Sequence, residues 1–108
     1  MEDAPADAAC QLSDNADGHR FELHVDGQLA AFAEYSLLKN GMLFSHTEVL
    51  PAFEGRGIGT AIARYGMDEV RRRSLLAIPV CPFIASFLRK HPEYQDLVSP
   101  ESRRAYRI

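Results

Sequence analysis

Hydrophobic and polar residues alternate along three consecutive stretches in the first half of the chain. The first is Phe21-Glu22-Leu23-His24-Val25, in which every second residue is apolar, as in a strand with one buried face. Asp26-Gly27 follows it, and this pair favours the positive φ angles of a tight hairpin turn. The pattern therefore predicts a β-hairpin whose return strand begins at about Gln28.

A second turn signal, Asn40-Gly41, separates the return strand, residues 28–38, from a third alternating stretch at residues 42–50. Regular alternation in this stretch puts Phe44, His46 and Glu48 on one face. We therefore expect three antiparallel strands joined as a meander.

The period of the pattern changes after Pro51. Between Ile58 and about Arg73 the apolar residues recur at the spacing of an amphipathic helix. Gly66 is costly inside a helix, by roughly 1 kcal/mol against alanine, so we expect it to mark a close approach between this helix and the sheet.

A short apolar stretch from Leu75 to Cys81 contains Pro79, which favours an edge strand. Because a helix joins it to the third strand, these two strands should be parallel. Pro82 is suited to the first turn of a last helix, which should end at about Lys90.

The predicted fold is therefore α/β, in the order β-β-β-α-β-α, with a mixed sheet. A chain of 108 residues is long enough for one hydrophobic core and short for two. We expect residues 1–18 to be a disordered acidic tail, residues 19–98 to be the folded domain, and residues 99–108 to be a basic C-terminal tail.

The charge distribution argues against most nucleic-acid-binding classes. The net charge is −3, so there is no general attraction to a polyanion. Two groups of basic residues either coat the surface or hold an anionic ligand: Arg71 to Arg73, and Arg89, Lys90, Arg103, Arg104 and Arg107.

The remaining composition favours a small cytoplasmic protein, a monomer or weak dimer. No apolar stretch approaches the roughly 20 residues of a membrane span, and the acidic N-terminus lacks the basic region of a signal peptide. Cys10 and Cys81 are far apart, which disfavours a disulfide framework, and the histidines show no metal-ligand spacing. No metal is expected.

The segment Glu54-Gly55-Arg56-Gly57-Ile58-Gly59 lies between a predicted strand and a predicted helix. Glycines there allow successive N–H groups to point into one concavity, and the helix N-terminus adds partial positive charge, so the segment is suited to bind a phosphate. It lacks the lysine of a Walker loop and the third glycine of a dinucleotide-binding fingerprint.

Gly57 and Gly59 match the Gln/Arg-x-x-Gly-x-Gly/Ala loop of the GCN5-related N-acetyltransferases, although Glu54 stands where Gln or Arg is usual. Three further blocks occur in order around it: residues 46–51 (HTEVLP), 78–83 (IPVCPF) and 90–94 (KHPEY). Over residues 20–95 the chain resembles the minimal, roughly hundred-residue branch of that family. Relative to full-length members it lacks the first strand and two helices, so the acceptor stays open.

The resemblance implies that acetyl-CoA, the substrate that carries coenzyme A, binds between the third strand and the strand that ends at Cys81. It implies a pyrophosphate on the glycine loop and a pantetheine arm beside the end of the third strand. The cofactor-binding residues expected on this basis are Val49, Leu50, Glu54, Gly55, Arg56, Gly57, Ile58, Gly59, Thr60, Phe83, Arg89 and Lys90.

Three residues are candidates for the chemistry. Cys81 precedes a helix start, where the helix dipole favours a thiolate, and it accepts the acetyl group, protonates the departing thiolate or only lines the pocket. His46 is a candidate base, with Glu48 beside it on the same strand.

The sequence thus predicts an N-acetyltransferase that transfers acetyl from acetyl-CoA to an unidentified amine, by direct attack or through Cys81. The alternative is a non-catalytic module or sensor that binds CoA or acetyl-CoA. Association with nucleic acid through the arginine groups is a weaker alternative.

Overall fold

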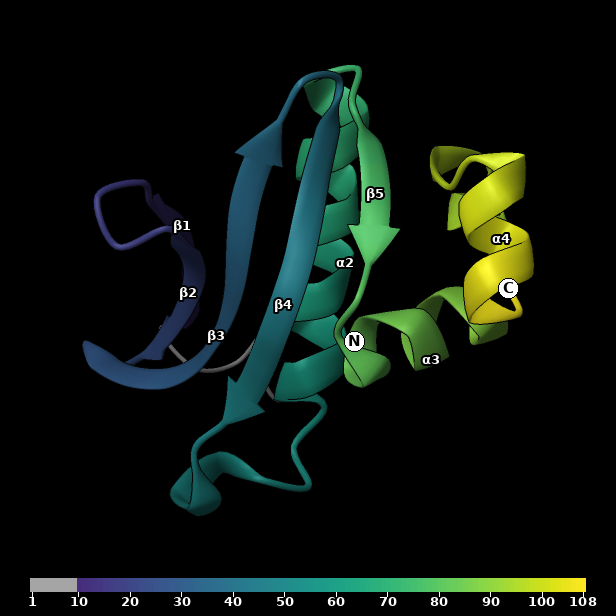
Figure 1. Cartoon of the computed structure of the whole chain (residues 1–108). Coiled ribbons are helices and arrows are strands. Elements are labelled where there is room, and N and C mark those ends of the chain that lie inside the picture. The colour runs from purple at the N-terminus through teal and green to yellow at the C-terminus, as the bar shows by residue number, and fades with distance from the viewer. Residues whose placement is uncertain (1–9) are drawn as a thin grey trace.

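The structure, a computed structural model, describes residues 10–108. Its sheet contains β1 (Cys10–Asn15), β2 (Arg20–Val25), β3 (Gln28–Leu38), β4 (Gly41–Val49) and β5 (Leu76–Pro79). Its helices are α2 (Ile58–Arg72), α3 (Pro82–Lys90) and α4 (Pro100–Tyr106), with short 3₁₀ turns η1 (Pro51–Phe53) and η2 (Pro92–Leu97) (Figure 1). The predicted β-β-β-α-β-α order is confirmed between residues 20 and 90, and its class is α/β.

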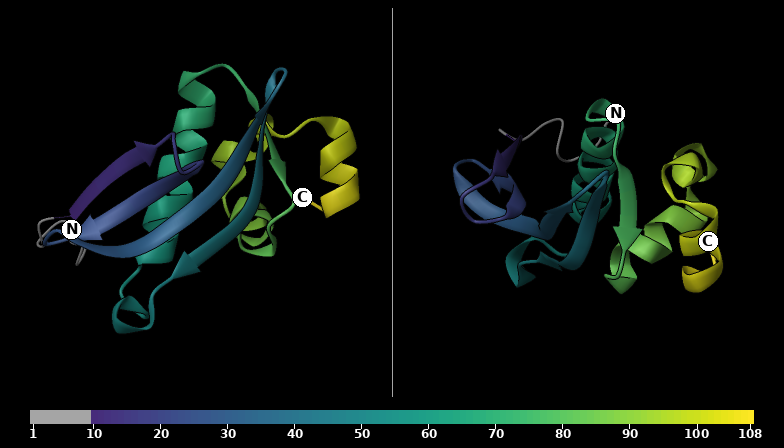
Figure 2. Two further views of the ribbon diagram at one scale, coloured as in Figure 1. Left: turned by 60° about the vertical axis from the view of Figure 1, so that its left-hand side comes forward. Right: turned by 45° about the horizontal axis from the view of Figure 1, so that its top comes forward.

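The five strands lie in their sequence order, with β1 and β5 at opposite edges of the sheet. Neighbouring strands are antiparallel except β4 and β5, which are parallel as predicted. Helix α2 packs along one face and contacts β2, β3, β4 and β5. The helices α3 and α4 gather beyond the β5 edge, so within residues 10–108 no helix lies over the face of the sheet opposite α2 (Figures 1 and 2).

The core lies between α2 and the sheet. The alternating side chains Phe21, Leu23 and Val25 of β2 are buried there. A methyl group on Gly66 would lie only 3.2 Å from Phe44 Cε1, so the close approach of helix and sheet predicted at this glycine is confirmed. Among residues 10–108, no helix combines the length and the apolar character that crossing a bilayer requires.

The prediction of a disordered tail over residues 1–18 is wrong for its second part. Residues 10–15 form β1, which pairs with β2 from Cys10↔Val25 to Asn15↔Arg20; residues 1–9 lie outside the described part. Most of β1 is exposed and it has no apolar alternation, so nothing in its sequence marks it as a strand. Backbone pairing and the side chain of Asp14 hold it in place.

Asp14 joins β1 to the centre of the fold. Its carboxylate accepts a hydrogen bond from Tyr35 Oη at 2.6 Å and lies 2.8 Å from Arg73 Nη2. Arg73 also binds Glu69 at 3.0 Å, which explains the one acidic residue that interrupts the apolar side of α2. This cluster of Asp14, Tyr35, Glu69 and Arg73 connects the edge strand, the sheet and the carboxyl end of the helix.

The pKa of Tyr35 provides a test of this cluster. Burial, followed by the hydrogen bond to Asp14, raises the pKa of Tyr35 from 10.0 to about 12. The fold therefore favours the neutral phenol, and the resulting stability is complete below pH 10 and is lost as the pH rises to about 12. Across this interval we expect the free energy of unfolding of the wild type to fall by about 2 kcal/mol more than that of Tyr35→Phe. Urea unfolding at both pH values measures this difference; parallel pH profiles would contradict it.

The basic C-terminal tail expected at residues 99–108 is in fact ordered as a helix over Pro100–Tyr106. Ser99 caps its N-terminus by accepting a hydrogen bond from the N–H of Ser102 at 3.2 Å. At its other end the Arg89 guanidinium donates to the carbonyls of Tyr106 and Arg107, at 2.7 and 3.1 Å. A local cap and one long-range contact thus order a segment whose composition indicates only a charged tail.

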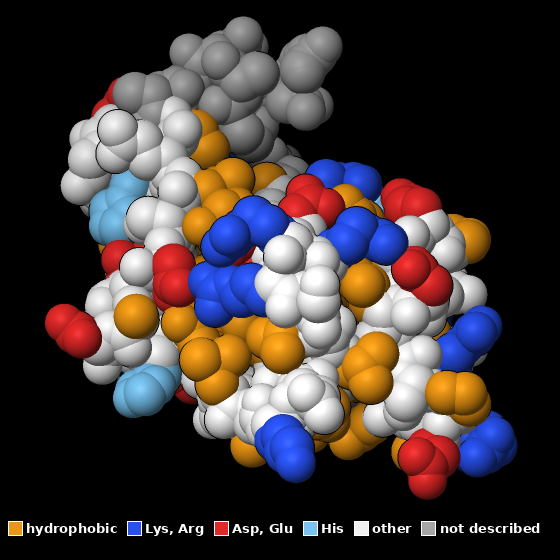
Figure 3. Space-filling model, turned by 90° about the horizontal axis from the view of Figure 1, so that it is seen from above, with side chains coloured by type: hydrophobic (Ala, Val, Ile, Leu, Met, Phe, Trp, Pro, Cys, Tyr) orange, Lys and Arg blue, Asp and Glu red, His pale blue; other side chains and the backbone are white. Residues whose placement is uncertain are grey.

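The run of three arginines at the end of α2 is engaged in ion pairs. Arg71 binds Asp96 at 2.9 Å, Arg72 binds Glu69 at 2.8 Å, and Arg73 binds both Glu69 and Asp14. Seen from above, positive and negative side chains alternate over this end of the molecule, with hydrophobic side chains between them (Figure 3). Arg71 and Arg73 therefore join α2 to η2 and β1, whereas the pair of Arg72 lies within the helix.

Candidate functional site

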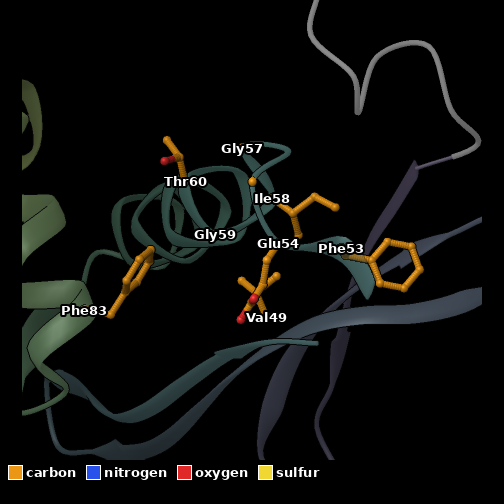
Figure 4. A pocket seen from close by; sticks show the side chains of 9 residues that line it. Val49, Phe53, Glu54, Gly57, Ile58, Gly59, Thr60 and Phe83 are labelled. Carbon is orange, nitrogen blue, oxygen red and sulfur yellow. The ribbon is translucent and has the colours of Figure 1, made fainter. Parts of the chain in front are cut away.

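A pocket of about 240 Å³ lies where the glycine loop meets the end of β4 and the start of α3 (Figure 4). It brings the end of β4 and the glycine loop, which are neighbours in the sequence, together with Phe83 of the distant helix α3. Eight of the expected cofactor-binding residues line it: Val49, Glu54, Gly55, Gly57, Ile58, Gly59, Thr60 and Phe83. Phe53 also lines it and was not expected.

The glycine loop leaves the first turn of α2 open toward this pocket. Gly55 and Gly57 have φ angles of 78° and 75°, in the left-handed region that side chains disfavour, and Gly57 is the N-cap of the helix. The first intrahelical bond runs from the N–H of Ala61 to the carbonyl of Gly57, at 3.1 Å. The N–H groups of residues 58–60 therefore have no partner within the helix. Together with the helix dipole they favour an anion.

Gly59 is required for a different reason. A methyl group on its Cα would lie 2.9 Å from Phe83 Cζ and 3.4 Å from Val49 Cγ2. The first turn of α2 thus packs closely between the start of α3 and the end of β4, and Figure 4 shows Val49 and Phe83 on either side of it. Any side chain at position 59 would take space from the pocket.

Strand β4 separates from β5 beside the pocket. Their pairing ends at Phe44↔Pro79, and β4 continues to Val49 paired with β3 alone. The N–H of Leu50 donates to Ala30 of β3 at 2.8 Å, so it is not turned to the pocket. Since successive residues of a strand point their N–H groups to opposite edges, those of Val49 and Thr47 are directed into the gap beyond β4. The edge of β4 in this gap is suited to form hydrogen bonds with an extended ligand that contains amide groups.

The alternation predicted for Phe44, His46 and Glu48 is wrong for Phe44. A β-bulge shifts the register between Glu34 and Tyr35, so that Tyr35 pairs with Phe44 and Glu34 pairs with His46. The extra residue turns Phe44 toward α2, where it is fully buried, whereas His46 and Glu48 lie on the opposite, open face. A bulge depends on the pairing of two strands, so alternation along one strand does not reveal it.

His46 and Glu48 form a pair on that open face. His46 Nε2 lies 3.1 Å from Glu48 Oε1, and their side chains are 53% and 48% exposed. When Nε2 carries the proton and donates a hydrogen bond to Glu48, Nδ1 of His46 is free to accept a proton. Neither side chain lines the pocket, which is on the other side of β4. The pair is therefore placed to act on a group that reaches the gap from the open face.

Cys81 is almost completely buried, with 2% of its surface exposed, and it is not part of the pocket lining. Its N–H donates to the carbonyl of Phe44 at 2.8 Å, which fixes it where β4 and β5 separate. Its thiol donates to Thr47 Oγ1 at 3.5 Å. The sequence reasoning missed Thr47, and the only signal was its position between His46 and Glu48, on the alternate face.

The basic residues expected to meet phosphates behave differently from one another. Arg56 is exposed, and its guanidinium carbon lies 5.4 Å from the centre of the Phe53 ring at the pocket edge. Arg89 points away and binds the carboxyl end of α4, so the structure does not support its expected contact with a cofactor. Lys90 lines a second hollow next to the pocket. In the described part of the chain, no three potential ligand side chains come together to hold a metal ion.

Comparisons with known proteins agree with this geometry. Residues 20–97 match the family model described as GCN5-related N-acetyl-transferase. The protein NATD1 of Xenopus tropicalis is 37% identical over 57 residues, 51% of this chain and 52% of that protein, and NATD1 of Bos taurus is 35% identical over 57 residues. The chain thus spans about half the length of the curated relatives it matches.

Two solved structures are similar to this one. The ribosomal-protein-S18-alanine N-acetyltransferase of Escherichia coli matches with a TM-score of 0.51 and 26% identity, over 53% of this chain and 37% of that chain. A GCN5-like protein from Staphylococcus aureus matches more extensively, with a TM-score of 0.65 over 82% of this chain and 87% of that chain. Its identity of 22% makes it a likeness of fold alone.

Proposed function

The chain belongs to the GCN5-related N-acetyltransferase family, and on this premise we propose that it transfers an acetyl group from acetyl-CoA to an amine. The observation that carries the proposal is the position of the pocket. It borders both the open first turn of α2, which favours an anion, and the end of β4 that has separated from β5. Acetyl-CoA has a pyrophosphate for the first feature and an amide-containing arm for the second.

The residues present are compatible with acetyl-CoA in this pocket. The pyrophosphate lies against the N–H groups of residues 58–60, for which the positive φ angles of Gly55 and Gly57 prepare the loop. The pantetheine arm follows the edge of β4 at Val49 and packs against Phe83, whose ring is 40% exposed. The thioester then reaches the gap near Thr47, where an N–H group of β4 polarises its carbonyl.

In the transfer step the amine attacks the thioester carbon, the C–S bond breaks, and CoA departs as its thiol. The amine approaches from the open face of the sheet, because the acetyl-CoA occupies the α2 side. His46, oriented by Glu48, accepts the proton that the attacking nitrogen loses. Cys81, held by Thr47 where β4 and β5 separate, donates a proton to the departing sulfur and regains one through solvent as His46 releases the proton it took from the amine. Its burial supports direct attack over an acetyl-cysteine intermediate.

Calorimetric titration with acetyl-CoA, followed by chromatographic measurement of CoA released with a panel of amines, tests the proposal. We expect saturable binding and amine-dependent release. Failure of acetyl-CoA to bind at millimolar concentration would overturn it, and binding without release would favour a non-catalytic module. Intact mass measured after incubation with acetyl-CoA alone separates the two routes, since a protein carrying one added acetyl group at Cys81 would contradict direct attack.

Glu54 is the one residue of the pocket that opposes an anionic ligand. Its side chain lines the pocket and is exposed. We expect Glu54→Gln to bind acetyl-CoA about fivefold more tightly, since removing a carboxylate near a pyrophosphate relieves a repulsion of about 1 kcal/mol. The gain should shrink as salt is added. Calorimetry of both proteins at low and high ionic strength measures it; an unchanged or weaker affinity would place the pyrophosphate elsewhere.

A further inference from the structure

A second hollow of about 80 Å³ adjoins the pocket along α3. Thr60 and Phe83 belong to the walls of both, so the two form one groove that runs from the glycine loop to the carboxyl end of α3. The remaining wall of the second hollow comes from α3 and the residue after it: Ser86, Phe87, Lys90 and His91.

Lys90 is the cation available in this hollow. Arg89, its neighbour, is bound to the carbonyls at the end of α4. Arg64, on the facing side of α2, donates to Tyr94 Oη at 3.3 Å and pairs with Glu93 at 3.6 Å. Within residues 10–108 the Lys90 ammonium has no ion pair or hydrogen bond. The structure thus commits the other nearby cations to the fold and leaves Lys90 to meet a ligand.

The negative groups around the hollow are also engaged. The last carbonyls of a helix repel an anion, but those of Leu88 and Arg89 accept hydrogen bonds from Gln95 Nε2, at 3.0 and 3.5 Å. Glu93 is paired with Arg64 and lies 3.3 Å from His91 Nδ1. The His91 ring stacks on Phe87 with a centroid distance of 4.1 Å, which fixes that wall. An anion placed here therefore meets Lys90 without an unpaired carboxylate opposite it.

The size and the lining of the hollow suit a phosphate group. Its volume of about 80 Å³, in a hollow that is partly open to solvent, is enough for one phosphate group. The hydroxyls of Ser86 and Thr60 and the ammonium of Lys90 are the donors that a phosphate monoester requires.

We propose that the second hollow binds the phosphate monoester on the ribose of CoA, with Lys90 as its cation, so that the protein selects CoA over dephospho-CoA. The inference rests on the proposed function in one respect, that acetyl-CoA is the ligand of the first pocket. The pyrophosphate on the first turn of α2 places the attached ribose beside Thr60, the residue common to both parts of the groove.

The test is a calorimetric comparison of two ligands, acetyl-CoA and acetyl-dephospho-CoA, with two proteins, wild type and Lys90→Gln. For wild type we expect acetyl-dephospho-CoA to bind about tenfold more weakly, the value of one charge-assisted contact. Lys90→Gln should bind acetyl-CoA about tenfold more weakly than wild type and should not distinguish the two ligands. Arg104→Gln, which removes an exposed cation of α4 away from the groove, is the matched control and should behave as wild type.

Equal affinity of wild type for both ligands would overturn the inference while leaving the proposed function intact. So would an equal loss of affinity for both ligands in Lys90→Gln, because the lysine would then act on the fold and not on the phosphate. If wild type binds neither thioester, the proposed function itself fails.

Discussion

Replacing Gly59 by valine is expected to weaken acetyl-CoA binding by at least about 100-fold while leaving the protein folded. The side chain would be built into a space where even a methyl group lies 2.9 Å from Phe83 and 3.4 Å from Val49. Phe83 can turn away because its ring is partly exposed, so the fold survives, but the added methyl groups then occupy the pocket beside the first-turn amides. Calorimetry measures the binding, and urea unfolding shows that the variant is native.

Gly66→Ala is the matched control, since it alters the other glycine of α2. Its new methyl group meets Phe44 at 3.2 Å, inside the core and two helical turns beyond the first turn that borders the pocket. Overpacking by this methyl group costs about 1–3 kcal/mol, more than the roughly 1 kcal/mol that alanine gains over glycine inside a helix, so we expect the free energy of unfolding to fall by about 1 kcal/mol and acetyl-CoA binding to be unchanged. If Gly59→Val binds acetyl-CoA as wild type does, the glycine loop is not the pyrophosphate site.

The second large effect is expected from His46→Gln, which should reduce kcat for amine acetylation by about 100-fold or more, with acetyl-CoA affinity unchanged. Glutamine keeps a hydrogen-bonding group next to Glu48 but is not a base at neutral pH. Because His46 lies on the open face of β4 and does not line the pocket, its loss affects the transfer step and not the binding of the thioester. Steady-state kinetics with saturating acetyl-CoA, together with calorimetry, separate these quantities.

His24→Gln is the control, because it makes the same substitution on the same open face of the sheet. His24 Nε2 lies 3.7 Å from Glu22 Oε1 on β2, so it repeats the histidine–glutamate pair two strands away from the gap. We expect this variant to retain wild-type kcat. Equal losses in both variants would indicate an effect on the sheet surface, and no loss in His46→Gln would exclude His46 as the base.

The sequence alone determined the elements that depend on neighbouring residues. Alternation and the Asp26-Gly27 turn define β2 and β3, because both signals act within a few residues. The glycine loop and the start of α2 at Ile58 were predicted for the same reason: Gly55 and Gly57 can adopt positive φ angles without the steric cost that a side chain would add. Most of the pocket lining was therefore expected from the sequence, with Val49 and Phe83 added by the family resemblance.

Only the tertiary structure decided the arrangement of the catalytic candidates. The bulge opposite Glu34 separates the faces of Phe44 and His46, and the hydrogen bond from Cys81 to Thr47 joins the start of α3 to β4. The bulge depends on how β3 and β4 pair, and the hydrogen bond joins residues more than thirty positions apart. No pattern within one segment encodes either feature.

The same distinction applies to the charged side chains. Arg89 and Lys90 are adjacent and equally basic in sequence, yet one binds the end of α4 and the other lines the groove. Successive residues of a helix point about 100° apart, so the packing of α4 against one side of α3 determines which cation remains for a ligand. The sequence determined that a glycine loop precedes α2, and the tertiary structure decided which residues surround it in the candidate site.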